Sequence, residues 1–254
     1  MATGRFKERV VFITGAASGI GRATATHFGA EGAKVFAADV NADGLRETTE
    51  TIRQAGGAGA GSVCDVSDMT AVETAVAGAV KLFGGIDILV NAAGVGGFAR
   101  LEETDEKTFQ RTVGINLGGV FHTTKAAMPH LLARPGANVV NVGSTASLRG
   151  QAYASVYSAS KAALVLFTRS IALEFATRGV RANCVCPGGV RTPLARGFQL
   201  RDDFEPHLLE YSRPPAVGTF SEPEDIARVI AFLASEDAKM INGAMLVADH
   251  GTLA

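Results

Sequence analysis

Three side chains in the second half of the sequence have the types and spacing needed to move a proton. Tyr157 and Lys161 lie four residues apart in YSASKAALVLF, so on a helix they share one face. A tyrosine is ordinarily protonated at neutral pH, and an ammonium group beside it favours the phenolate, which makes it a better general base. Ser144 follows a strand-like run and offers a hydroxyl that could hold a substrate oxygen beside the phenol.

The tyrosine and lysine pair is weak evidence by itself, since a half-buried tyrosine with a lysine one turn away is common by chance. Tyr153 has Tyr157, and not a lysine, four residues further on. We therefore expect Tyr153 to line a pocket or to pack. The functional interpretation of Tyr157 depends on the motifs in the rest of the chain.

A glycine-rich turn comes directly after the first apolar run. Residues 14–21 read TGAASGIG, a spacing that lets backbone N–H groups and a helix N-terminus approach a pyrophosphate. About twenty residues later Asp39 ends the next run, where a carboxylate accepts hydrogen bonds from an adenosine ribose and repels a 2′-phosphate. This acid predicts NAD, and not NADP, as the cofactor. The residues of the turn expected to contact the cofactor are Gly15, Ser18, Gly19, Ile20 and Gly21.

Short β-branched runs alternate with helix-like segments along the whole chain. Apolar residues at i, i+3 and i+4 mark the helices, for example over 69–83 and 160–178. Strands separated by helices predict right-handed βαβ crossovers. We therefore expect an α/β fold: a Rossmann-like, doubly wound, seven-stranded parallel sheet with helices on both faces, in a single domain over residues 1–254. The predicted strands are 8–14, 34–39, 61–66, 87–92, 138–143, 180–187 and 244–249.

Two features of the last third of the chain add detail. Ser221, followed three residues later by Glu224, is a capping-box pattern that predicts the start of a helix over 224–235. The segment 194–219 mixes aromatic, charged and proline residues, and it is long for a connection. Because it follows the carboxyl end of a strand, where open α/β sheets bind ligands, we expect it to be a substrate-binding lid.

The composition excludes several classes of protein. Hydrophobic residues make up 47% of the 254 residues and charged residues 19%, which is typical of a folded core and not of a disordered chain. The net charge of −1 offers no basic excess for nucleic acid, and no apolar stretch is long enough to span a membrane. Cys64, Cys184 and Cys186 lack metal-ligand spacing and suggest buried thiols in a reducing compartment. We expect a cytoplasmic protein with no metal site.

The motifs in this order resemble the short-chain dehydrogenase/reductase family, and the resemblance covers essentially the whole chain. The step of thirteen residues from Ser144 to Tyr157 also fits the family. Each motif is weak alone, whereas the full set in this order is specific. The matching positions are Thr14-Gly15-x-x-x-Gly19-x-Gly21, Asp65-Val66, Asn91-Ala92-Ala93-Gly94, Asn116, Ser144, Tyr157-x-x-x-Lys161 and Pro187-Gly188.

The resemblance implies a role for each matched residue. Tyr157 would be the general acid/base, and Ser144 would orient the substrate oxygen. Lys161 would hold the nicotinamide ribose and lower the pKa of Tyr157. Asn116, in the helical GINLGG segment, would anchor a water that links Lys161 to solvent. The remaining positions would contact the cofactor: Asp65 and Val66 at the adenine, Asn91 and Gly94 along its centre, and Pro187, Gly188, Val190 and Thr192 around the carboxamide.

The sequence departs from the family pattern in two places. The usual Asn-Asn-Ala-Gly reads Asn91-Ala92-Ala93-Gly94, which removes one amide at a strand end and could loosen the cofactor floor. The usual Asp-Gly-Gly near the C-terminus reads Asp249-His250-Gly251, and we expect His250 at the surface or in a subunit contact.

The leading hypothesis is an NAD-dependent short-chain alcohol dehydrogenase or ketone reductase that exchanges a hydride with a small-molecule secondary alcohol or ketone. One alternative is a 3-oxoacyl-thioester reductase, which Asp39 disfavours because biosynthetic reductases of this kind usually draw on NADPH. Another is a non-catalytic NAD-binding regulator, which the presence of both Tyr157 and Lys161 disfavours.

The substrate and the assembly are less determined by the sequence. Phe98, Tyr153, Phe198 and Leu200 suggest an apolar cavity, and hence a cyclic or aliphatic alcohol. The resemblance implies a homotetramer, for which the predicted helices over 105–131 and 153–178 could supply interfaces.

Overall fold

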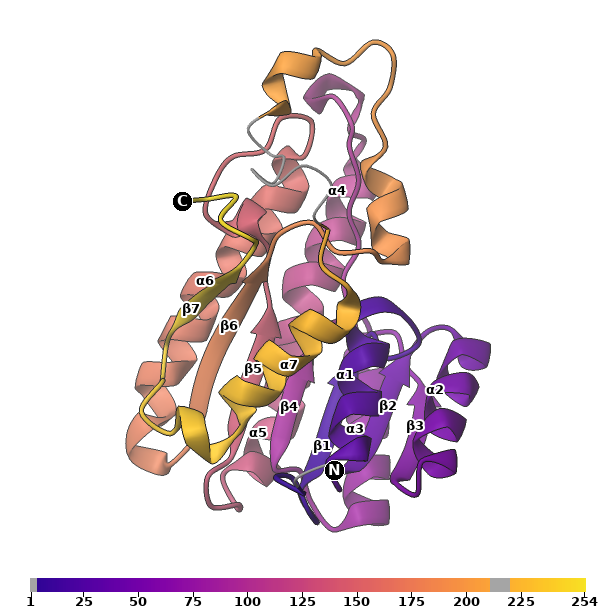
Figure 1. Ribbon diagram of the computed structural model, residues 1–254, viewed down its shortest axis with the longest axis vertical. Coiled ribbons are helices and arrows are strands. Elements are labelled where there is room, and N and C mark those ends of the chain that lie inside the picture. Colours follow the sequence, from indigo (N-terminus) through magenta and orange to yellow (C-terminus); the bar gives the residue numbers. More distant parts are fainter. Residues whose placement is uncertain (1–3, 211–219) are drawn as a thin grey trace.

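The computed structural model describes residues 4–210 and 220–254, which form one seven-stranded parallel sheet with the order β3-β2-β1-β4-β5-β6-β7 (Figure 1). The chain starts at the centre of the sheet, proceeds to one edge, and returns to the centre to build the other half. This is the predicted doubly wound, Rossmann-like topology, and its switch point lies between β1 and β4. The strands are β1 Val10–Thr14, β2 Lys34–Asp39, β3 Ala58–Val63, β4 Ile88–Asn91, β5 Asn138–Val142, β6 Arg181–Pro187 and β7 Met245–Ala248.

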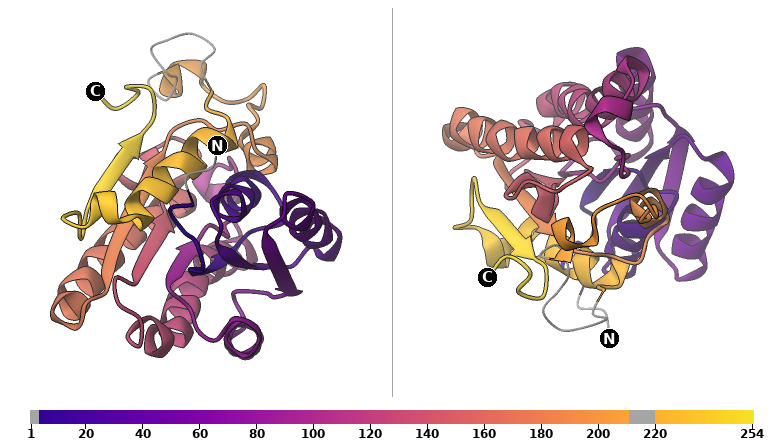
Figure 2. Two further views of the ribbon diagram at one scale, coloured as in Figure 1. Left: turned by 60° about the horizontal axis from the view of Figure 1, so that its bottom comes forward. Right: turned by 90° about the horizontal axis from the view of Figure 1, so that it is seen from above.

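Helices cover both faces of the sheet, as predicted (Figures 1 and 2). One face carries α1 (Gly19–Ala30), α2 (Ala42–Gln54) and α7 (Pro223–Ala234). The other carries α3 (Met69–Phe83), α5 (Gly119–Leu131) and α6 (Ser155–Phe175), with the short α4 (Glu106–Val113) leading into α5. Short 3₁₀ turns connect several of these elements: Leu101–Glu103, Thr145–Ser147, Ala176–Arg178, Pro193–Phe198, Pro206–Leu208 and Glu236–Ala238.

The central strand β1 shows why the sheet needs both layers. Val11 and Ile13 belong to the core formed with α1, α2 and α7, whereas Phe12 belongs to the core formed with α3 and α5. All three side chains are fully buried. Full burial of such a side chain contributes about 1.5–3 kcal/mol, so the continuous apolar run over 10–13 encodes a strand covered on two faces.

The predicted third strand is wrong in its position. The structure places β3 at Ala58–Val63, three residues before the predicted 61–66, so Asp65 and Val66 follow the strand. The strand lies at the edge of the sheet, and its residues are alternately covered and exposed. A half-exposed edge strand made mostly of Ala, Gly and Ser carries little hydrophobic signal. The prediction was therefore shifted toward the more apolar residues that follow the strand.

The predicted helix over 105–131 is also interrupted. Gly114–Gly118 forms a π-helical turn between α4 and α5, and it contains Asn116. Turns of this kind are rare and occur often at functional sites. The spacing of apolar residues in the sequence gave no sign of this π-helical turn.

The predicted capping box at Ser221 is one residue out of place. Glu222 caps α7, its side chain accepting from the Asp225 N–H while the Asp225 carboxylate accepts from the Glu222 N–H. Pro223 at the first helical position fixes the start there, because its φ is already helical. Ser221 instead forms a β-bridge with Val190.

The connections at the carboxyl ends of the strands extend well beyond the sheet (Figure 1). Residues 95–104 follow β4, and residues 193–210 follow β6. The last part of the expected lid, 211–219, lies outside the described residues. None of the helices within 4–210 and 220–254 combines the length and hydrophobicity needed to cross a lipid bilayer.

Candidate active site

Tyr157 lies in the first turn of α6, directly opposite the end of β5. Ser144 caps the 3₁₀ turn that follows β5, and its hydroxyl hydrogen-bonds the Tyr157 phenol. Burial raises the pKa of Tyr157, because the phenolate is poorly solvated there, and the Ser144 hydrogen bond opposes this rise. The structure thus places Ser144, the residue predicted to hold the substrate oxygen, beside Tyr157, the predicted general acid/base.

Lys161 is one helical turn further along α6, and its ammonium group points to the strand end. Its Nζ donates to the backbone carbonyl of Val142 at 2.8 Å, and burial lowers the pKa of Lys161 to about 8. The expected lowering of the Tyr157 pKa by Lys161 stays a prediction. Burial acts on both groups in the direction of their neutral forms, and Lys161 is not among the groups that shift Tyr157.

Asn116 is held in place by the π-helical turn. Its Oδ1 accepts from the Val95 N–H at 2.8 Å, and its Nδ2 donates to the Val95 carbonyl and to Ser160 Oγ, each at 2.9 Å. Gly94 lies between Asn116 and Lys161, since a Cβ at this glycine would be 3.3 Å from both Asn116 Oδ1 and Lys161 Nζ. The predicted water between Asn116 and Lys161 stays a prediction.

The glycine-rich turn has room for backbone only. A Cβ on Gly21 would lie 2.1 Å from the carbonyl oxygen of Gly15, and a Cβ on Gly15 would lie 2.7 Å from the Ala93 nitrogen. Gly15 also has a φ of +68°, which favours glycine. Ser18 stands at the N-cap of α1 without a side-chain cap, so the N–H groups of the first turn are available to an anion. This cradle fits a dinucleotide pyrophosphate.

Asp39 ends β2 beside this turn. Its carboxylate accepts from the Ala17 N–H at 3.0 Å and from the Asn41 N–H at 2.9 Å. An ionised carboxylate has about four acceptor positions, which leaves capacity for two ribose hydroxyls. The nearby Arg22 donates to the Ala17 carbonyl and pairs with Glu47 at 2.9 Å.

The loop after β6 closes the other side of the crevice. Pro187 ends the strand, and Gly188 fits against Asp249, because a Cβ there would lie 2.9 Å from Asp249 Cβ. A Cβ on Gly19 would lie 3.0 Å from Thr192 Cγ2, so the loop that carries Thr192 faces the glycine-rich turn directly. Val190 is buried and is fixed by its bridge to Ser221.

The remaining predicted cofactor contacts differ in how they lie. Asp65 accepts from the N–H and hydroxyl of Ser67, which lowers its pKa, and Val66 packs closely against α5. The Asn91 side chain is buried in a polar ladder, accepting from Thr123 Oγ1 at 2.6 Å and donating to Asn141 Oδ1 at 2.8 Å. The Asn91 side chain is thus engaged within the protein, and its role along the cofactor stays a prediction.

Thr14 is a supporting residue that the sequence reasoning named only as part of a motif. Its hydroxyl accepts from the N–H groups of Ala92 and Ala93, each at 3.2 Å, and so holds the end of β4 against the glycine-rich turn. A threonine ending an apolar strand is too ordinary a signal to be recognised in advance.

Two buried thiols lie beneath the end of β5. Cys184 and Cys186 project from one face of β6 with their Sγ atoms 3.9 Å apart, as the sequence predicted. A Cβ on Gly143 would lie 2.9 and 3.0 Å from the two sulfur atoms, so this glycine lets the Ser144 turn sit directly on them.

Aromatic side chains cover Tyr157 from the outside. Phe98 and Phe198 pack against it, and Tyr153 and Phe204 stack further out. Three of the four residues expected to form an apolar cavity thus come together. Leu200 does not, since it is 54% exposed.

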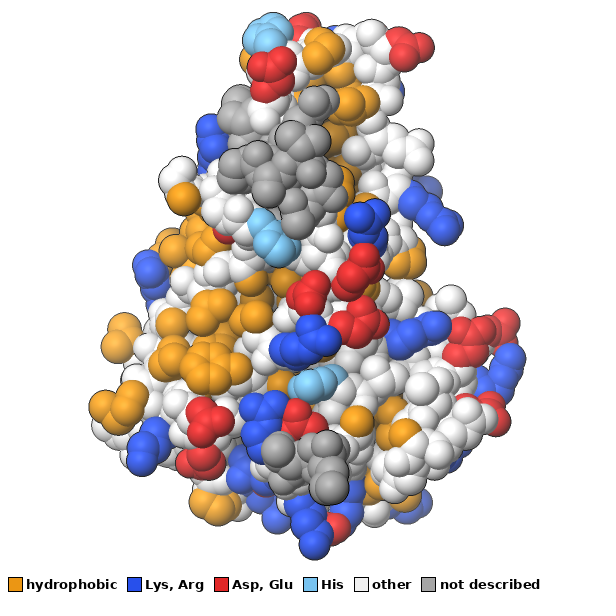
Figure 3. Space-filling model, viewed as in Figure 1, with side chains coloured by type: hydrophobic (Ala, Val, Ile, Leu, Met, Phe, Trp, Pro, Cys, Tyr) orange, Lys and Arg blue, Asp and Glu red, His pale blue; other side chains and the backbone are white. Residues whose placement is uncertain are grey.

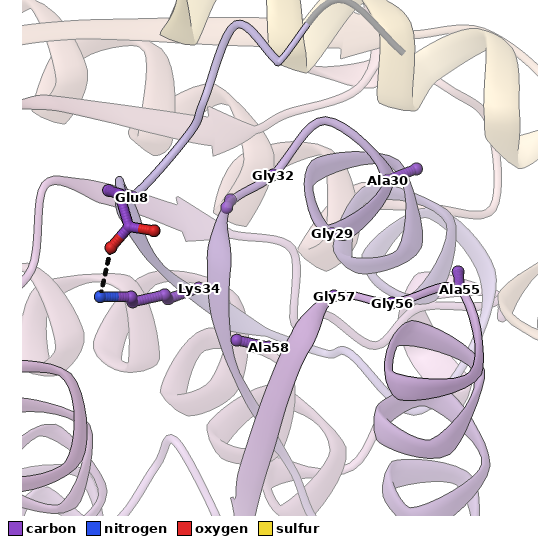
Figure 4. Close-up of a pocket in the computed structure, with 10 residues that line it drawn as sticks. Glu8, Gly29, Ala30, Gly32, Lys34, Ala55, Gly56, Gly57 and Ala58 are labelled. Atoms are coloured by element: carbon purple, nitrogen blue, oxygen red, sulfur yellow. Dashed lines mark ion pairs between the residues drawn. The ribbon is translucent and has the colours of Figure 1, made fainter. Parts of the chain in front are cut away.

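A separate hollow of about 270 Å³ lies at the opposite edge of the sheet, beside the first residues of β2 and β3 (Figure 4). Backbone of several glycines forms much of its lining, and its charged residues, Glu8 and Lys34, pair with each other at 2.7 Å. This hollow has no group that could serve the chemistry of Tyr157.

The sheet, the pyrophosphate cradle and the Ser144–Tyr157 pair together define a nicotinamide-dependent oxidoreductase. Comparisons with known proteins agree. A family model described as "Enoyl-(Acyl carrier protein) reductase" matches residues 15–252. The chain is 39% identical to meso-2,3-butanediol dehydrogenase of Serratia marcescens over 252 residues, covering 98% of this chain and 96% of that protein.

Solved structures share the fold at high similarity. A short chain dehydrogenase from Mycobacterium paratuberculosis bound to NAD is similar with a TM-score of 0.91 and 30% identity, over 98% of both chains. One from Burkholderia cenocepacia J2315 in complex with NADP gives 0.88 and 30%, over 98% of this chain and all of that one. The chain belongs to the short-chain dehydrogenase/reductase family, and its cofactor is a nicotinamide dinucleotide.

Proposed function

We propose that the protein is an NAD-dependent dehydrogenase of secondary alcohols that also reduces the corresponding ketones. The observation that carries this proposal is the hydrogen bond between Ser144 and the buried phenol of Tyr157, at the end of the crevice that begins at the glycine-rich turn. A hydroxyl and a phenol side by side can hold one substrate oxygen between them.

Each residue of the site has its own role in the proposed reaction. Ser144 donates to the substrate oxygen and fixes its position, and Tyr157 Oη takes the hydroxyl proton during oxidation or returns it during reduction. NAD, when bound in the crevice, would supply the acceptor for the hydride of the carbinol carbon. Lys161, whose pKa is about 8, can gain and lose a proton in the working range, and Asn116 positions the Val95 backbone and Ser160 beside it.

The preference for NAD over NADP rests on charge at the adenosine end. The Asp39 carboxylate lies where the ribose hydroxyls would bind, and its charge disfavours a 2′-phosphate. Arg22, a cation near this end, is already paired with Glu47. Both features support NAD.

Reduction of a 3-oxoacyl thioester is the second candidate, because the chain is also 35% identical, over 247 residues, to a 3-oxoacyl-[acyl-carrier-protein] reductase of Thermotoga maritima. Turnover of an acetoacetyl thioester with NADPH, faster than any alcohol oxidation with NAD, would favour it. Turnover of alcohols with NAD and poor use of NADPH would favour the first proposal.

The proposal also includes the domain organisation, the kind of substrate, the localisation and the assembly of the protein. We propose that the chain is a single domain in which the described part of the expected lid, 194–210, covers an apolar substrate, cyclic or aliphatic. The protein is a cytoplasmic homotetramer. Support for the assembly comes from exposed apolar residues on and near α6 and β7, where Figure 3 shows apolar side chains gathered on the surface.

The test is a panel of secondary alcohols and ketones, with NADH followed by its absorbance. Wild-type protein should turn over members of the panel, and Tyr157→Phe should lower kcat by about 10²–10⁴-fold, the usual contribution of a general acid/base. Ser158→Ala is a matched control, since the Ser158 hydroxyl, one residue from Tyr157, is buried without a hydrogen-bond partner. Equal rates for wild type and Tyr157→Phe would refute the proposal.

A further inference from the structure

Phe198 reaches the proton-transfer site from the connection after β6. Its ring meets the Tyr157 ring edge to face, with centroids 5.0 Å apart and planes at 70°. Phe98, from the connection after β4, meets Phe198 in the same way at 5.2 Å and 87°. Two segments distant in sequence therefore place an aromatic wall against the phenol.

The backbone is shaped to allow this contact. A Cβ on Gly96 would lie 2.4 Å from Tyr157 Cδ2 and 2.9 Å from Phe198 Cζ, so any larger residue would separate the two rings. The Phe98 N–H donates to the carbonyl of Gly197 at 2.8 Å, which fixes the residue before Phe198 on the opposing segment. The main chain at Gly96 and Gly197 therefore holds the Phe198 ring against Tyr157.

A second set of contacts holds the outer part of the same segment. Phe204 stacks on Tyr153 with centroids 4.0 Å apart and planes at 6°, and the Glu205 N–H donates to Tyr153 Oη at 3.0 Å. The guanidinium of Arg100 lies 5.4 Å from the Tyr153 ring centroid and 5.8 Å from that of Phe204. These contacts tie residues 203–205 to residues on two other segments, so Phe198 sits in a braced structure and not in a free loop.

We infer that Phe198, backed by Phe98, is the residue that limits the size of the substrate, and that the protein prefers secondary alcohols and ketones whose substituents are small and aliphatic over those with an aryl substituent. This inference rests on the proposed function. The substrate oxygen must contact Tyr157 Oη, so the substituents of the carbinol carbon lie within a few ångströms of the phenol ring. Phe198 packs against that ring, and a bulky substituent on this side collides with it.

The test compares a small and a bulky alcohol, 2-butanol and 1-phenylethanol, oxidised with NAD. Phe198→Ala should raise the ratio of kcat/KM for 1-phenylethanol to kcat/KM for 2-butanol by about 10- to 200-fold, the range for the fit of small hydrocarbon groups in a pocket. Phe198→Leu should give an intermediate ratio and guards against loss of folding in the alanine variant. Leu200→Ala, an exposed position on the same segment, should keep the wild-type ratio.

The possible outcomes distinguish a failure of the inference about Phe198 from a failure of the proposed function. A wild type that oxidises alcohols with an unchanged ratio in both Phe198 variants overturns the inference and leaves the proposed function intact. A wild type that oxidises no alcohol of the panel overturns both. A wild type that already prefers 1-phenylethanol also overturns the inference.

Discussion

The ammonium nitrogen of Lys161 lies 2.8 Å from the carbonyl oxygen of Val142, although Tyr157 is only one helical turn away. The lysine thus bonds to the end of β5, the strand that leads into the turn capped by Ser144. The hydrogen bond ties α6 to β5 directly beneath the reacting groups. Lys161 consequently has a structural bond in addition to its proposed part in proton transfer.

The burial of Lys161 predicts a pH dependence of stability. Its pKa falls from 10.5 to about 8 in the folded protein. Between these values the unfolded chain binds a proton that the folded chain does not, so stability should rise with pH, by at most about 1.4 kcal/mol per pH unit. Urea unfolding over this range, without added cofactor, should show the rise in wild type and not in Lys161→Met. Lys81→Met, at an exposed lysine of α3, should keep the wild-type slope.

The Asp39 carboxylate predicts the response to cofactor exchange. Asp39→Asn should reduce the preference for NADH over NADPH, measured as the ratio of kcat/KM values, by about 10-fold or more, equivalent to about 1.4 kcal/mol. Asp43→Asn is the control, because Asp43 is an exposed acid on α2 that pairs with Arg46. A ratio that changes equally in both variants would point to the general surface charge and not to Asp39.

The packing of Gly21 predicts loss of cofactor binding on a minimal substitution. Gly21→Ala places a methyl group 2.1 Å from the Gly15 carbonyl, so the turn must open. We expect NAD affinity, measured by fluorescence titration, to fall below detection while the midpoint of thermal unfolding also drops. Gly150→Ala should change neither quantity, since a Cβ there meets nothing within 4 Å. Normal NAD binding by Gly21→Ala would show that the turn is not the cradle.

The exposed apolar residues of α6 predict the behaviour of the proposed tetramer. Leu173 is 82% exposed, and a glutamate in its place would put a charge into any interface built on this helix. Light scattering coupled to gel filtration should report a tetramer for wild type and a smaller species for Leu173→Glu. Leu82→Glu, at an exposed leucine of α3, should stay tetrameric. A monomeric wild type would contradict the proposed assembly.

The sequence predicted the parts of the fold that depend on local pattern. The β1 run, the glycine-rich turn and Asp39 lie within one βαβ unit, and their spacing alone implies how they meet. Tyr157 and Ser144 also come together as predicted. The position of β3 was not predictable from hydrophobicity, because an edge strand of small residues has little to bury.

The features that the sequence did not predict depend on contacts between distant segments. The bond of Lys161 to Val142, the π-helical turn at Asn116 and the buried ladder of Asn91 each involve partners on other elements. The packing of Phe198 against Phe98 is also a contact between distant segments. It forms only when the connections after β4 and β6 have folded over the sheet. Residue type alone suggested an apolar cavity and included Leu200, which the fold leaves exposed.

The turn that follows β7 is connected, through Ser221, to the loop that follows β6. His250 Nε2 lies 3.1 Å from Ser221 Oγ, and Ser221 pairs with Val190; Asp249 folds the tail back by accepting from the N–H groups of Gly251 and Leu253. A change that displaces this turn would therefore also displace the loop at Val190, on the side of the crevice where we propose that the nicotinamide binds. At the amino end, by contrast, Arg5 pairs with Glu31 at the end of α1, so a purification tag fused there would leave the loop at Val190 in place.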